Sequence, residues 1–363
     1  RTISSPTARS PFASVLLPYC LSASPMVLRA IQALAACHWS QHDPRYRVMG
    51  LTLKTRVLRD FRQRITTDQH FALKEDPEVV VVMMLLCLYE IVDHCDQRWI
   101  IHLQGAKDII RLRRQRLTSY DPVSSFAELF FAFQDVMGRT ACAKADLFGP
   151  RYWGENDTSI NEWMGCSPAL VSTLFSIMDL SRSRRSTDQS QFDAQASIVK
   201  RQLESLMQDP PTHSDDQVLP RIADLKKLTC TVYLHCALYN GGPSDPFVKA
   251  HVREILQGVL DLSAQGAVCN VMWPVFVAAV ELDLLDAAVA DPQTGALTYD
   301  RRLVLEMLTE MAKTSVSSVS RTRAVIEQVW LAPDLNASQT TSASGLNDWE
   351  RYVVPVSDAL SLV

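Results

Sequence analysis

Apolar residues recur at helical spacing along most of the chain. Within residues 27–38 they fall three or four positions apart, and the same spacing predicts helices over about 45–65 and 97–114. The segment 78–92 differs from these because it is apolar on every side except at Glu90, near its end. A helix of that kind is stable in water only when other helices surround it. We therefore place 78–92 at the centre of a helical bundle.

A Ser-Pro or Asp-Pro pair precedes six of the helical stretches. A serine or aspartate side chain can cap the free amides of a first turn, and proline at the first helical position loses no hydrogen bond. The pairs begin at Ser24, Asp43, Asp76, Asp121, Ser167 and Asp245. This recurrence favours helices over strands throughout the chain.

The remaining helical patterns set the fold class. They lie near 122–145, 168–182, 190–208, 219–240, 246–263, 272–290, 301–313 and 320–331. Glycine supplies only 12 of 363 residues, about half of its usual share of about 7%. Since β folds use glycine in turns and bends, and since no fixed-period repeat occurs, the sequence predicts an all-α fold, an irregular multi-helix bundle of about twelve helices.

Composition shifts suggest where the domain is interrupted. Residues 1–15 are rich in Ser, Pro and Thr and are expected to form a flexible lead-in. Residues 16–363 are expected to form a single all-helical domain, with linkers at 181–191 and 332–346. The chain opens without an initiator methionine, so we expect it to be a segment of a longer protein.

Charge and cysteine content narrow the class of protein. The formal net charge is −4, whereas a chain that binds DNA by itself usually carries a basic surplus. The nine cysteines are dispersed, with no C-x-x-C pair and no signal peptide, as in reduced cytosolic or nuclear proteins. The longest apolar runs, 79–89 and 271–280, are shorter than the roughly 20 residues that cross a bilayer. We therefore expect no membrane association.

No catalytic signature is found. The chain lacks G-x-S-x-G, a glycine-rich phosphate loop and H-E-x-x-H. A helical terpene cyclase would need an aspartate-rich metal motif on a helix, but the adjacent pair Asp215-Asp216 lies in a polar stretch without a third carboxylate. A di-iron bundle would need paired Glu-x-x-His motifs, which do not occur. We expect no catalytic residue, no metal site and no enzyme activity.

Several groups have both a structural and a functional interpretation. Clusters at 87–95 and 230–236 combine Cys and His, but without the ligand spacing of a closed zinc site they are interpreted as core cysteines. Glu90 and Glu281 end apolar runs, and structural pairing with Arg98 or Arg139 is favoured over ligand contact. The aromatic residues of these helices are first of all core residues.

Taken together, several blocks resemble one known family. The blocks lie at 24–31 (SPMVLRAI), 82–91 (VMMLLCLYEI), 99–106 (WIIHLQGA), 164–168 (MGCSP) and 273–279 (WPVFVAA). Their order resembles that of the fungal-specific transcription factor regulatory domain of the second subfamily, which is found C-terminal to zinc binuclear-cluster DNA-binding modules. One departure is the serine that separates Cys and Pro in the fourth block.

The resemblance implies a nuclear regulatory domain. Such a domain controls activation and dimerisation, in some cases through a small-molecule effector, and it contacts transcriptional co-regulators. DNA would be bound only through an N-terminal module absent from this sequence, and zinc is expected only there. The resemblance thus implies a homodimer without a cofactor of its own. A helical protein-interaction scaffold without a ligand is the alternative, and a helical enzyme of the terpene-cyclase type is disfavoured.

The most apolar helices also suggest where an effector would bind. The helices at 78–92, 99–110 and 273–285 should pack together, and the space between bundle helices is a common place for a pocket. In this hypothesis aromatic side chains form the walls and two polar side chains orient the ligand. The residues are Tyr89, Trp99, Trp273 and Phe276 for the walls, with His102 and Glu281 as the polar groups. The competing interpretation is that the aromatic side chains fill the space completely.

Overall fold

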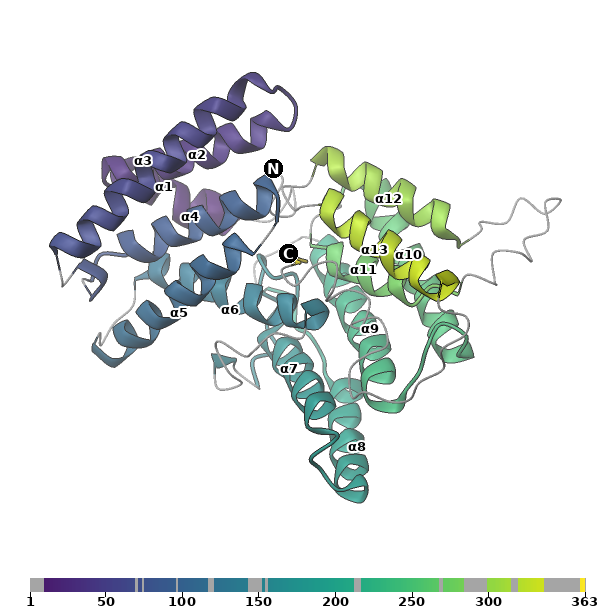
Figure 1. Ribbon diagram of the computed structural model, residues 1–363. Coiled ribbons are helices and arrows are strands. Elements are labelled where there is room, and N and C mark those ends of the chain that lie inside the picture. Colours follow the sequence, from purple (N-terminus) through teal and green to yellow (C-terminus); the bar gives the residue numbers. More distant parts are fainter. Residues whose placement is uncertain are drawn as a thin grey trace.

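The computed structural model describes residues 10–68, 71–73, 75–95, 97–116, 121–142, 152–153, 156–211, 217–267, 270–283, 299–314, 319–335 and 360–362. These residues contain thirteen α-helices and no β-strand, so the all-α prediction is confirmed (Figure 1). The helices are α1 (Leu17–Ser22), α2 (Pro25–Ser40), α3 (Arg45–Thr67), α4 (Glu78–Asp93), α5 (Arg98–Arg116), α6 (Pro122–Cys142), α7 (Pro168–Ser183), α8 (Gln189–Ser205), α9 (Val218–Tyr239), α10 (Pro246–Ala264), α11 (Met272–Val280), α12 (Arg301–Thr314) and α13 (Val319–Leu335).

All six predicted Ser-Pro and Asp-Pro starts precede a helix. Ser24 Oγ accepts a hydrogen bond from the backbone N–H of Val27, and Ser167 Oγ accepts one from Leu170. At the other four starts the carboxylate accepts a hydrogen bond from the N–H two residues later: Asp43, Asp76, Asp121 and Asp245. Each contact satisfies an amide that the helix itself leaves without a partner.

Helix α4 lies at the centre of the N-terminal half, as its sequence predicts. Every residue from Glu78 to Val92 is buried, and α2, α5 and α6 pack around the helix. Helix α3 covers α2 from outside, so that α2 and α3 form a hairpin at the edge of the molecule (Figure 1). The hairpin closes tightly at Gly50, where a Cβ would lie only 3.2 Å from the backbone nitrogen of Cys37.

The C-terminal half is organised around α9. This helix packs against α7, α8, α10 and α11, and α11 packs in turn against α12 and α13. The indole of Trp330 on α13 donates a hydrogen bond to the carbonyl of Ala279 on α11 at 2.7 Å. Helix α6 joins the two halves because it contacts α4 and α5 on one side and α7 on the other. Residues 360–362 return to α6, where the Ser361 hydroxyl donates to Gln134 Oε1.

Helical structure extends into several segments that were expected to be irregular. Phe12–Leu16 forms a π-helical turn ahead of α1, inside the predicted lead-in of 1–15, and the ring of Phe12 packs 5.1 Å from that of Phe126. The predicted linker at 181–191 is mostly helical, since α7 reaches Ser183 and α8 begins at Gln189. The linker predicted at 332–346 overlaps the end of α13, and its remainder lies outside the described residues.

Helix α11 is shorter than its pattern predicts. It ends at Val280 instead of continuing to 290, and residues 284–290 lie outside the described part. Pro274 stands in the first turn of α11, where its missing N–H breaks no hydrogen bond. No helix in the described ranges combines the length and the hydrophobicity needed to cross a bilayer.

The burial of α4 makes a direct prediction for stability. Leu85 is 1% exposed in the middle of this helix. Leu85→Ala should lower the free energy of unfolding by about 3 kcal/mol, because it removes buried methyl groups and leaves a cavity. Urea unfolding followed by circular dichroism would measure the change. A loss below about 1 kcal/mol would contradict a central position for α4.

Candidate functional site

The six side chains predicted to surround an effector lie in two neighbourhoods. Tyr89, Trp99 and His102 belong to α4 and α5, whereas Trp273, Phe276 and Glu281 belong to α11 and its C-terminal end. Helix α4 packs mainly against α2, α5 and α6, while α11 packs mainly against α9, α10, α12 and α13 (Figure 1). Three of the six residues thus lie among the helices that pack around α4, and the other three lie among those that pack around α11.

The first neighbourhood is centred on the buried carboxylate of Glu90. Its Oε1 lies 2.7 Å from Lys54 Nζ and 3.8 Å from His102 Nε2, and its Oε2 lies 3.4 Å from Arg98 Nε. Burial raises the pKa of Glu90, but the nearby His102 and Lys54 and the charge of Arg98 lower it by more, so the pKa lies below its usual value. The carboxylate is thus held in its charged form by groups from α3 and α5.

Lys54 was missed as a partner of Glu90. Other cations of its helix, such as Arg56 and Arg62, are exposed, but the side chain of Lys54 is only 9% exposed. The signal was present: Gly50, Lys54, Val57 and Phe61 fall at helical spacing, and all four are buried. Pairing of Glu90 with Arg98, by contrast, is confirmed.

Tyr89 and Trp99 are enclosed by their own neighbours. The Lys54 ammonium lies 4.6 Å from the centre of the Tyr89 ring, and Tyr89 packs with Cys37 of α2 in a small apolar cluster. Trp99 is 3% exposed, and its indole lies against α6, where a Cβ at Gly138 would come within 3.2 Å of Trp99 Cη2. These contacts give both aromatic side chains a structural role in this neighbourhood.

The second neighbourhood, around α11, retains one unsatisfied polar group. Trp273 and Phe276 are buried, and the Trp273 ring centroid lies 6.4 Å from that of Tyr233 on α9. Glu281 ends α11 and is also buried. The indole N–H of Trp273 is buried and has no hydrogen-bond acceptor among the described residues. A buried donor without an acceptor costs about 1–3 kcal/mol, which makes this N–H a point at which a water or a ligand oxygen would be stabilised.

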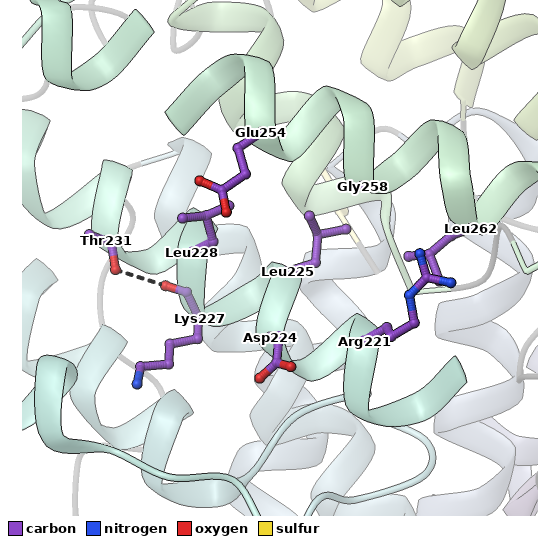
Figure 2. A pocket seen from close by; sticks show the side chains of 9 residues that line it. All are labelled: Arg221, Asp224, Leu225, Lys227, Leu228, Thr231, Glu254, Gly258 and Leu262. Atoms are coloured by element: carbon purple, nitrogen blue, oxygen red, sulfur yellow. Dashed lines mark hydrogen bonds between the residues drawn. The ribbon is translucent and has the colours of Figure 1, made fainter. Parts of the chain in front are cut away.

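A groove that the sequence did not predict lies between α9 and α10. Its volume is about 410 Å³. Three leucines and a glycine form the apolar part, and charged or polar side chains flank it, as Figure 2 shows. The lining residues are Arg221, Asp224, Leu225, Lys227, Leu228 and Thr231 from α9 with Glu254, Gly258 and Leu262 from α10. Sequence periodicity gives no signal for it, because the groove arises from how two ordinary amphipathic helices meet.

The two cationic side chains of the groove interact with other described residues, whereas its two carboxylates do not. Lys227 Nζ donates a hydrogen bond to the carbonyl oxygen of Leu206 at 2.6 Å, and Arg221 Nη2 lies 3.7 Å from Asp261 Oδ2. Asp224 and Glu254 have no hydrogen bond or ion pair with any described residue. Two unpaired carboxylates beside an apolar floor suit a ligand that has an apolar body and an amine or guanidinium group.

The turn before α7 preserves one of the blocks noted in the sequence. Gly165 has a φ of +64°, a conformation that glycine adopts without steric cost, and Ser167 caps the helix that follows. The serine inserted in this block is therefore the N-cap residue itself. No group of three or more His, Cys, Asp or Glu side chains in the described segments could hold a metal ion.

Comparison with known proteins gives one result for the whole chain. A family model described as the fungal specific transcription factor domain matches residues 1–363. No curated protein and no solved structure matches the chain.

Proposed function

This chain belongs to the family of fungal specific transcription factor domains, and we propose that it regulates transcription in the nucleus without catalysing a reaction. The match over residues 1–363 is the observation that carries this proposal. The net charge of −4 supports the proposal that a separate zinc binuclear-cluster module, and not this chain, binds DNA. Zinc would then be a cofactor of that module and not of this chain.

The proposal includes self-association. Zinc-cluster modules that read paired half-sites need a dimer, because the spacing of the half-sites reflects the symmetry of the protein. A regulatory domain that dimerises would supply this symmetry and control which sites are occupied. Transcriptional co-regulators would then be recruited by the assembled dimer.

We place the effector in the α9–α10 groove. Its unpaired Asp224 and Glu254 favour a small molecule with an apolar body and a cationic end. Such a ligand would contact both α9 and α10. Because α9 also contacts α7, α8 and α11, a ligand that prefers one packing of α9 would shift the populations of the whole C-terminal half.

A reporter assay tests the regulatory role. The chain is fused to a monomeric DNA-binding module and expressed in a fungal reporter strain with either paired or single half-sites. We expect reporter output to differ from that of the module alone, and to depend on paired half-sites because dimerisation is required. Output equal to that of the module alone at both kinds of site would contradict the proposal.

Charge reversal in the groove tests the effector site in the same assay. Asp224→Lys combined with Glu254→Lys should alter reporter output, because a cationic ligand would be repelled. Glu310→Lys on the exposed face of α12 is the control for one such change, since among the described residues Glu310 is paired with Lys313, outside the groove. An equal effect of the groove and control variants would remove the groove from the proposal while leaving the regulatory role intact.

A further inference from the structure

The outer face of α3 is exposed and changes character along its length. It is apolar toward its N-terminal end, where the side chains of Val48 and Met49 are 72% and 46% exposed. It is cationic further along, where Arg56, Arg59 and Arg62 point outward. We define the α3 outer face as Val48, Met49, Thr52, Thr55, Arg56, Arg59 and Arg62. These residues fall on one side of the helix, opposite the buried positions of α3.

The apolar end of this face continues onto the end of α2. Trp39 is 59% exposed, and its ring lies 6.3 Å from that of Tyr46, which is 39% exposed. Isolated exposed apolar residues are common, but an exposed tryptophan and tyrosine near Met49, which follows Tyr46 by three positions on α3, are typical of a protein-binding surface. The α2–α3 hairpin, which carries these exposed residues, lies at the edge of the molecule (Figure 1).

Few carboxylates among the described residues lie against the cationic end. Helix α3 contains seven lysine and arginine residues and one aspartate, although the whole chain carries a net charge of −4. The guanidinium groups of Arg56 and Arg62 make no hydrogen bond or ion pair with a described residue. The carboxylate nearest to Arg59 is that of Asp60 at 3.6 Å, and Asp60 is also paired with Arg29. Two of the three outward arginine side chains therefore have no partner in the described part of the chain.

We propose that the α3 outer face docks an acidic amphipathic helix of a partner protein. From Val48 to Arg62 the face is about 21 Å long at 1.5 Å per residue, so it accommodates a helix of about four turns. The partner would place aspartate or glutamate against the arginines and leucine, phenylalanine or methionine against Val48, Met49 and Trp39. Helix-on-surface recognition of this kind combines apolar anchors with complementary charge.

Helix dipoles specify the direction of the partner. Acidic residues are most favourable in the first turns of a helix, where the dipole is positive. If these turns lie over Arg56, Arg59 and Arg62, the partner runs antiparallel to α3. Its apolar residues, in the last two turns, then reach Val48 and Met49.

The charge and the apolar residues of the α3 outer face favour an acidic helix over two other partners, a second copy of this chain and duplex DNA. A second copy of this chain paired through the same face would supply no carboxylate, so its arginines would meet either the arginines or the apolar side chains of the first copy. Duplex DNA would be attracted to the arginines but would gain little from Val48, Met49 and Trp39, since its outer surface is phosphate and sugar. The inference does not depend on the groove between α9 and α10 or on an effector.

The test uses a peptide probe with the full 363-residue chain. The probe is a fluorescently labelled peptide of about 16 residues, acetylated, with glutamates in its first two turns and leucines in its last two. Fluorescence anisotropy at about 50 mM salt, where screening is moderate, measures its dissociation constant. Arg56→Glu combined with Arg62→Glu should weaken binding at least about tenfold, and Val48→Gln should weaken it severalfold. Both changes lie on an exposed helix face, so the fold should be retained.

Matched controls separate a specific face from general charge. Arg201→Glu combined with Arg302→Glu makes the same change in net charge on α8 and α12, and binding should change less than about twofold. A peptide with glutamine in place of glutamate should bind the unmodified chain weakly, and one with lysine in place of glutamate should prefer the R56E/R62E variant.

Three outcomes would overturn the proposal. One is equal binding of the probe to R56E/R62E and to the control variant. Another is binding of a labelled DNA duplex that is tighter than that of the peptide and is lost in R56E/R62E. The third is a change in the self-association of the chain, measured by sedimentation, in V48Q or R56E/R62E, because a second copy would then occupy this face.

Discussion

Replacing Lys54 with methionine should lower the free energy of unfolding by about 3–5 kcal/mol, the usual cost of removing one partner of a buried ion pair. Methionine fills the space of the lysine chain but cannot bond to Glu90, whose side chain is only 3% exposed. Arg98 and His102 remain beside the carboxylate, but at 3.4 and 3.8 Å they are farther from it than Lys54 Nζ at 2.7 Å. Denaturant unfolding of both proteins at pH 7 measures the difference.

A neighbouring residue on the same helix supplies the control. Arg56→Met makes the same kind of change two positions away, on the exposed face, and should cost less than about 0.5 kcal/mol. The double variant K54M/E90L should recover most of the loss, since an apolar pair leaves no buried charge without a partner. A loss below about 1 kcal/mol in K54M would mean that Arg98 and His102 neutralise Glu90 by themselves.

The pH dependence of this difference has a definite sign. The pKa of Glu90 is lowered below its usual value of 4.5 in the folded protein. Its contribution to stability is therefore present above pH 4.5 and is lost as the pH falls through the folded pKa. In K54M the pKa of Glu90 should rise, because the nearest cation is gone. The difference in stability between the two proteins should accordingly shrink as the pH falls below about 4.5.

Local signals in the sequence predicted the helices well. The apolar spacing of α4 predicted its burial, and the Ser-Pro and Asp-Pro pairs predicted where six helices begin. Both signals come from residues within one or two helical turns of each other. They can therefore be read from the sequence without knowledge of the tertiary structure. Residues 12–15 lack such a pattern, and their π-helical turn depends on distant packing of Phe12 against Phe126.

Contacts between helices were predicted less well, for a physical reason. The aromatic character of Trp99 and Trp273 indicates that both are buried, but it does not say against which helix. Trp99 lies against Gly138 of α6, and Trp273 lies beside Tyr233 of α9. Such pairings depend on how all the helices pack together. The spacing of apolar residues along the sequence shows which face of a helix is buried, but not which other helix covers it.

Buried thiols should make the protein unstable in alkaline solution. Burial raises the pKa of Cys20 to about 11 and, with the charge of Asp93, that of Cys37 to about 12. Burial likewise raises the pKa values of Cys87, Cys166 and Cys230 above the usual 9.0. The folded protein therefore keeps protons on these thiols that the unfolded chain releases. Stability from these groups is complete below pH 9 and is lost as the pH rises toward the folded pKa values.

The loss of stability from the five thiols should exceed the gain from groups whose contribution to stability rises with pH. Cys20 and Cys37 each contribute about 1 kcal/mol of lost stability by about pH 10. Cys87, Cys166 and Cys230 add to this loss, so the free energy of unfolding should fall by more than about 2 kcal/mol between pH 8 and pH 10. Lys226 acts in the opposite direction, because burial lowers its pKa and stability from this group rises with pH, but it is a single group. Urea unfolding at several pH values, in the presence of a reductant, measures the slope.

Two variants distinguish thiol ionisation from other alkaline effects. Cys230→Ala removes one titrating group from α9 and should reduce the slope with pH, even though the truncation itself costs some stability. Val232→Ala truncates a fully buried neighbour on the same helix and should lower stability equally at every pH. If the two variants show the same slope, ionisation of Cys230 plays no part. A free energy of unfolding that stays constant from pH 8 to about pH 10 would mean that water reaches these thiols, and that the packing around α4 and α9 is looser than their burial indicates.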